Sequence, residues 1–297
     1  MIARDGVFLP SIIYDESRQA FRIWYQRLST DGIPSHRIDV LHRQSTDGLM
    51  WGPLQTVHSG DEWGTGVRKI DTTYRWLTYT IQPKSGVFTA DSSDGLTWSP
   101  LRQLHIPSDS RIGDIVDLFY DPLRRRWGVF VKLHAEPNEF GANSRTASTR
   151  RLTGVTSSHD FKEWTRAYRV FTPDDDDPGE IEFYGAACCV VRGNRLIAFL
   201  RVLRDDIDQG IGYTVLAWSD DGSTWERART PFLGRCRGSF DGAIAWVYGV
   251  TEHAGTLYMV YSAYDTGHKA GDRAVAIATM PSSALRVPDG AGPHCSS

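Results

Sequence analysis

The stretch Ser92-Ser93-Asp94-Gly95-Leu96-Thr97-Trp98 decides the fold, because its spacing returns three more times along the chain. The copies read Ser-x-Asp-x-x-x-Trp and begin at Ser45, Ser92, Ser158 and Ser219. Serine and aspartate side chains accept backbone N–H hydrogen bonds in tight turns, and glycine supplies the positive φ that such turns need. The spacing therefore predicts a repeated turn that leads into a strand. A ligand site is the alternative, but a single site has no reason to recur four times.

The third copy departs from the others at one position. Phe161 stands where the other three copies have glycine. Because a bulky residue rarely adopts positive φ, this copy is expected to turn with a different geometry.

The composition indicates an all-β protein. The 297 residues include 10 Trp, 12 Tyr, 12 Phe, 28 Gly and 14 Pro, and short aromatic and β-branched runs are separated by Gly, Asp and Ser. The formal net charge of −3 argues against binding along a nucleic-acid backbone. No apolar run approaches the roughly 20 residues of a membrane span. The N-terminal residues lack a signal-peptide pattern and the four cysteines lack a disulfide spacing, which predicts a cytoplasmic protein.

Strand-like runs recur around each turn and divide the chain into similar units. Each unit reads as four strands joined by hairpins, which predicts a five-bladed β-propeller with four-stranded antiparallel blades. The predicted blades cover about residues 6–58, 59–108, 109–172, 173–235 and 236–287, as one domain over residues 1–287. The remaining residues, 288–297, are rich in Gly, Pro and Ser and are predicted to form a flexible tail.

The opening Pro10-Ser11-Ile12-Ile13-Tyr14-Asp15 and the Ser-x-Asp-Gly-x-x-Trp turns resemble five-bladed propeller glycoside hydrolases, the relatives of families 32, 43, 62, 68 and 117. The resemblance runs from about Val7 to Met280. It implies carboxylate acid/base catalysis in a central funnel, on a small oligosaccharide or glycoside. The sequence has no zinc-protease motif, no Cys-x-x-Cys pair and no Gly-rich phosphate loop, so neither a cofactor nor a catalytic metal ion is expected. In these relatives an aspartate serves as base where this chain has Leu9, so the base must come from elsewhere or the reaction must differ.

The resemblance also points to catalytic acids at the starts of the inner strands. It implies Glu182 as general acid and Asp114 as orienting acid or base. Asp241 precedes another apolar inner strand, and Asp5 is an alternative base near Leu9. These four are the candidate catalytic residues.

Further polar and aromatic residues are expected near the same funnel mouth. Lys132 and Arg201 could hold sugar hydroxyls or carboxylates, while Trp63 and Tyr184 could stack on a sugar face. The candidate substrate-binding residues are Trp63, Asp117, Lys132, His134, Glu180, Tyr184 and Arg201.

Two other functions remain open from the sequence. A biosynthetic or lyase-type enzyme would rely more on His134 and Tyr184, and a non-catalytic propeller would bind sugars without turnover. The acidic run at residues 174–177 is interpreted as a solvated loop rather than a calcium site, because it lacks alternating ligand spacing. The expected partner is a carbohydrate, with neither nucleic acid nor membrane involved.

Overall fold

A computed structural model describes residues 1–28, 37–81, 84–141 and 149–286. Within these ranges the fold is all-β, and the helical content is a single 3-10 turn at Ser282–Ala284. None of it contains a helix that is long and apolar enough to cross a membrane. The predicted tail at residues 288–297 lies outside the described residues, and the cytoplasmic location stays a prediction.

The first twelve strands form three antiparallel sheets, each with four strands in chain order. The first sheet holds β1 (Val7–Asp15), β2 (Ala20–Leu28), β3 (Ile38–Ser45) and β4 (Gln55–Gly60). The second holds β5 (Glu62–Ile70), β6 (Thr73–Thr80), β7 (Gly86–Ser92) and β8 (Arg102–Leu104). The third holds β9 (Ile112–Asp121), β10 (Arg126–His134), β11 (Arg151–Ser158) and β12 (Tyr168–Phe171).

The last seven strands are linked into one larger sheet. They are β13 (Ile181–Arg192), β14 (Arg195–Arg204), β15 (Ile211–Ser219), β16 (Glu226–Arg227), β17 (Ile244–His253), β18 (Thr256–Tyr264) and β19 (Arg273–Pro281). A parallel contact between Gly212 and Ile244 joins the β13–β16 part to the β17–β19 part. The β17–β19 part has three strands instead of four. Ala3 forms a bridge with Val275 of β19, so the N-terminal segment lies where a fourth strand would pair.

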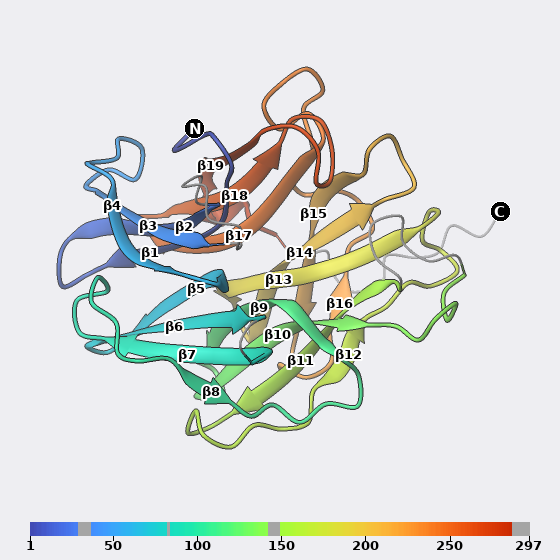
Figure 1. The fold of residues 1–297 in the computed structure, drawn as a ribbon, viewed down its shortest axis with the longest axis horizontal. Coiled ribbons are helices and arrows are strands. Elements are labelled where there is room, and N and C mark those ends of the chain that lie inside the picture. The colour runs from blue at the N-terminus through green and yellow to red at the C-terminus, as the bar shows by residue number, and fades with distance from the viewer. Residues whose placement is uncertain (29–36, 82–83, 142–148, 287–297) are drawn as a thin grey trace.

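The first strand of each group lies next to the first strands of its neighbours. β1 contacts β5 and β17, β9 contacts β5 and β13, and β13 also contacts β17. Figure 1 shows the groups arranged in chain order around a common centre. This all-β arrangement is consistent with a propeller-type fold.

The repeated Ser-x-Asp turns have the hydrogen bonds that the sequence predicted. In the second copy, Asp94 Oδ1 accepts from the backbone N–H groups of Leu96 and Thr97 at 2.8 Å, and Ser92 Oγ accepts from the N–H of Gly95 at 2.8 Å. The same pattern recurs in the other three copies. The interpretation of this repeat as a structural turn is confirmed.

The prediction of a different third turn is wrong. Phe161 has a φ of 62°, close to the 71° of Gly95, and accepts the same left-handed conformation. Its ring packs edge-on against Trp127 and Trp164, and the Arg75 guanidinium lies 4.0 Å from the ring centroid. Burial of a whole aromatic ring offsets the local backbone strain.

Each turn packs against the second strand of the sheet before it. Arg22 of β2 donates to the Asp94 carbonyl at 2.7 Å, and Trp24 Nε1 donates to the Gly95 carbonyl at 2.9 Å. A Cβ atom at Gly95 would lie 2.9 Å from Arg22 Nη1. Glycine is therefore favoured at position 95 by its φ and by the close approach of the neighbouring sheet, and this turn serves as an inter-sheet contact.

Candidate functional site

A pocket of about 250 Å³ opens at the end of the sheets where the first strands begin. Asp114 of β9, Lys132 and His134 of β10, Arg151 of β11 and Tyr184 of β13 contribute side chains to it. The sequence singled out four of these five residues; only Arg151 is new. The other polar residues of its described lining are Tyr79, Ser85, Arg111 and Lys269.

Asp114 is the one carboxylate among the described residues that line this pocket. It pairs with Lys132 Nζ from the adjacent strand, and its side chain remains 39% exposed against 6% for Lys132. Burial alone would raise the pKa of Asp114, but the charge and hydrogen bond of Lys132 hold that pKa below its usual value. Asp114 is therefore ionised at neutral pH and still open to the pocket.

Glu182 has a different environment. Its side chain is fully buried and lies outside the described lining of the pocket. Arg151 Nη1 donates to both carboxylate oxygens at 3.1 and 3.0 Å, and the Arg151 backbone N–H donates at 2.8 Å. A general acid must hold a proton that it can give to the substrate. The three hydrogen bonds of Glu182 all come from Arg151, so Glu182 holds in place a residue of the pocket lining.

Tyr184 connects the pocket to a buried chain of polar groups. Its hydroxyl lies 3.2 Å from His268 Nε2, and His268 Nδ1 lies 3.5 Å from Asp205 Oδ1. Burial raises the pKa of Tyr184, so its hydroxyl stays protonated. Burial also lowers the pKa of His268 to about 4, although Asp205 opposes this shift. A neutral imidazole accepts the tyrosine proton in a hydrogen bond, and the sequence did not single out His268 or Asp205.

Leu9, which stands where the resembled hydrolases were expected to have an aspartate, lies in apolar surroundings. Leu9 is buried in an aromatic and aliphatic cluster with Tyr184, Trp246 and Tyr248, at an irregularity in β1. Its φ of 51° is left-handed, and its backbone N–H donates to Ser262 Oγ at 3.0 Å. Asp5 is exposed in the bend before β1 and lies outside the described lining.

Asp117 and Arg201 pair with each other below the pocket. The Arg201 side chain is fully buried and also donates to the backbone carbonyls of Tyr184 and Val247 at 3.1 Å. These contacts leave Arg201 committed to the protein interior. The sequence predicted that both residues hold substrate. In the structure, neither of them belongs to the described lining of the pocket.

The remaining candidates also lie outside that lining. Asp241 accepts from the Tyr261 hydroxyl at 3.3 Å, Glu180 lies 3.8 Å from Arg150, and Trp63 packs against Phe8 with ring centroids 5.6 Å apart. His134, by contrast, lines the pocket, with its Nδ1 3.2 Å from Thr149 Oγ1. Burial and the charges of Lys132 and Arg111 lower the pKa of His134 to about 4.

The acidic run at residues 174–177 is held by arginines. Asp174 and Asp177 both bond to Arg227 and Arg229, with distances of 2.5 to 3.0 Å. These ion pairs give the run a structural role next to β16.

Comparison with known proteins supports the fold. No family model matches the sequence, and no curated protein matches it. Among solved structures, a "Glycoside hydrolase" aligns with a TM-score of 0.67 and 17% identity over 98% of this chain and 94% of that one. A glycosyl hydrolase from Bacteroides ovatus aligns with a TM-score of 0.68 and 11% identity over 96% and 87%. A thermostable family-43 glycoside hydrolase aligns with a TM-score of 0.67 and 13% identity over 92% and 88%.

This chain has the fold of propeller glycoside hydrolases. At these identities the likeness concerns the backbone, so the chemistry must be argued from the side chains of the pocket.

Proposed function

We propose that this protein cleaves glycosidic bonds and that the pocket around Asp114 is its active site. The observation that carries the proposal is an ionised, partly exposed carboxylate in a pocket built from several sheets of a fold shared with glycoside hydrolases. Active sites gather titratable groups with shifted pKa values in a concave site, as this pocket does.

We further propose that the sheets close into five blades around one axis. The neighbouring first strands and the Ala3–Val275 bridge between the N-terminal segment and β19 support this closure. Closure would bring β9, β13 and β17 to one central funnel. The predicted blade limits then describe a single domain over residues 1–287.

The side chains suit distinct tasks in cleavage. Asp114 accepts a proton from the attacking water or stabilises positive charge on the sugar ring, and Lys132 positions it. Tyr184 lines the pocket, and its protonated hydroxyl is bonded to His268. Glu182 positions Arg151, which binds a polar group of the substrate.

Elimination is a second candidate reaction. One observation favours it. The described lining has a single carboxylate, and it also includes Tyr184, which is hydrogen-bonded to His268. In this alternative Tyr184 and His134 would handle the proton, and cleavage would leave a double bond in the sugar.

The test is a turnover screen of the purified protein against aryl glycosides and oligosaccharides in isotopically labelled water. Hydrolysis places a labelled oxygen in the product, whereas elimination yields an unsaturated sugar without the label. Asp114→Asn should lower kcat by about 100-fold or more. The matched control, Asp109→Asn, changes an exposed aspartate that lies outside the described lining and should keep full activity.

Unchanged turnover in Asp114→Asn would remove the proposed site. Binding of sugars without any product would favour a non-catalytic propeller.

A further inference from the structure

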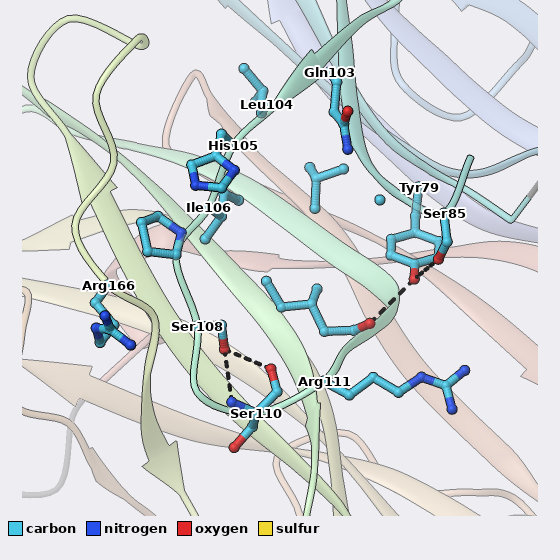
Figure 2. A pocket seen from close by; sticks show the side chains of 14 residues that line it. Tyr79, Ser85, Gln103, Leu104, His105, Ile106, Ser108, Ser110, Arg111 and Arg166 are labelled. Atoms are coloured by element: carbon cyan, nitrogen blue, oxygen red, sulfur yellow. Dashed lines mark hydrogen bonds between the residues drawn. The ribbon is translucent and has the colours of Figure 1, made fainter.

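A second pocket continues the first one along the outside of the β5–β8 sheet. It has a volume of about 500 Å³ and lies between β8 and the start of β9. Tyr79, Ser85 and Arg111 line both pockets. At this junction the Tyr79 hydroxyl bonds to Ser85 Oγ at 2.6 Å and to the Ile112 carbonyl at 3.2 Å (Figure 2). The two pockets therefore adjoin at these three residues and are together called the mouth groove.

The outer part of the mouth groove has mixed polar and apolar walls. Gln103 and His105 make no side-chain hydrogen bond within the described ranges, so their polar atoms are available to a ligand. The apolar residues Leu104 and Ile106 lie beside them (Figure 2), and Pro107 also belongs to this lining. A sugar has the same mixture, with hydroxyl groups at its edge and C–H groups on its faces. A few placed polar groups among apolar ones are typical of small-molecule sites.

The inner part of the mouth groove carries an excess of positive charge. Its described lining holds Arg111, Lys132, Arg151 and Lys269 against the single carboxylate Asp114. Glu182, beside Arg151, and Asp205, near Lys269, offset two further charges. Arg111 is exposed and has no ion pair with another described residue. A concave site of one sign attracts and orients ligands of the opposite sign.

We propose that the mouth groove binds an acidic oligosaccharide. A carboxylate-bearing sugar lies in the inner pocket, opposite Arg111, Arg151 and Lys269, and the following sugar units lie over Gln103 and His105. This inference rests on the proposed function and adds the class of substrate. It also explains why a groove continues beyond the pocket that holds Asp114.

The test is calorimetric binding to four probes: galacturonate, tetragalacturonate, glucose and cellotetraose. Tetragalacturonate should bind at least 10-fold more tightly than cellotetraose and than galacturonate, and added salt should weaken its binding. Arg111→Gln should remove most of the preference for the acidic tetramer. Gln103→Ala should weaken the tetramer about threefold and leave the monomer unchanged.

Lys162→Gln is the matched control, because it removes an exposed positive charge from a Ser-x-Asp turn outside both pockets. It should bind all four probes as the unmodified protein does. Thermal unfolding of each variant would show that binding changes do not reflect loss of fold.

Equal binding of the two tetramers, equal effects of Arg111→Gln and Lys162→Gln, or absence of tetragalacturonate binding would each overturn the inference. Turnover of neutral glycosides without any preference for acidic ones would overturn it and keep the proposed function. Tight acidic binding without turnover would keep the inference and remove the proposed function.

Discussion

Two acid–cation pairs at neighbouring strand starts look alike in the sequence and differ in the structure. Asp114 pairs with Lys132 at the pocket and keeps 39% of its side chain exposed. Glu182 pairs with Arg151 and is fully buried, with three hydrogen bonds from the same residue. In the first pair the carboxylate of Asp114 remains accessible to a substrate. In the second pair the carboxylate of Glu182 holds Arg151 in place.

The difference teaches that an acid at a strand start is not sufficient to identify a catalytic group. Lysine contacts a carboxylate as a compact point charge, whereas a guanidinium presents several donors and can engage both oxygens. Glu182 is thus saturated by Arg151, while Asp114 keeps oxygen atoms available. The cation partner therefore decides what each acid can do.

The largest expected effect that separates the pairs is on stability. Glu182→Gln leaves Arg151 buried without its charge partner and should lower the free energy of unfolding by about 3–5 kcal/mol. Asp114→Asn should lower it by less, about 1–3 kcal/mol, because Asp114 is 39% exposed although its partner Lys132 is buried. Urea unfolding followed by tryptophan fluorescence measures both. Similar losses in the two variants would remove the distinction between the pairs.

A smaller effect comes from Asp15, a buried carboxylate in the first sheet. Lys69 Nζ lies 2.5 Å from it, and Tyr74 also donates to it. Burial would raise the pKa of Asp15, but these two contacts lower it to about 2. In the unfolded chain Asp15 takes up its proton near pH 3.8. The stabilisation of the folded protein by ionised Asp15 is therefore fully present above that pH and is lost as pH falls toward 2.

The expected size of this contribution is about 2 kcal/mol. Asp15→Asn should lower stability by this amount at pH 7 and flatten the acid limb of the unfolding curve between about pH 4 and 2. An unchanged acid limb in the variant would show that the ion pairs of Asp15 do not drive acid unfolding.

An effect confined to acidic pH is expected at His134, next to the Asp114–Lys132 pair. The pKa of His134 falls from 6.5 to about 4 through burial and the nearby charges. Between these values the unfolded chain binds a proton that the folded chain excludes, so stability should decrease as pH falls from 6.5 to 4. His134→Asn should reduce this slope, measured by thermal unfolding across that range. A steeper slope in the variant would contradict the assignment.

Much of the fold could be predicted from the sequence because its signals are local. The Ser-x-Asp turns depend on hydrogen bonds within four residues, so their spacing revealed them. Phe161 was misjudged because its left-handed conformation is supported by Arg75 and Trp127, which lie outside the turn. The three-stranded last group was also missed, since Ala3 and Val275 pair across almost the whole chain.

The site was less predictable for the same reason. Asp114, Lys132, His134 and Tyr184 were singled out, but Arg151, Lys269 and His268 carried no local motif. Lys269 reaches the pocket from the connection between β18 and β19, more than a hundred positions after Arg151.

From the amino-acid order alone came the all-β class, the repeated turns and the acids at the starts of inner strands, because each depends on residues close together along the chain. Tertiary structure alone decided that Asp114 stays open to water and that Glu182 is enclosed by Arg151. The exposure of each carboxylate depends on the neighbouring sheet that packs against its strand. Such packing brings together residues that are far apart in the chain, so local sequence patterns do not reveal it.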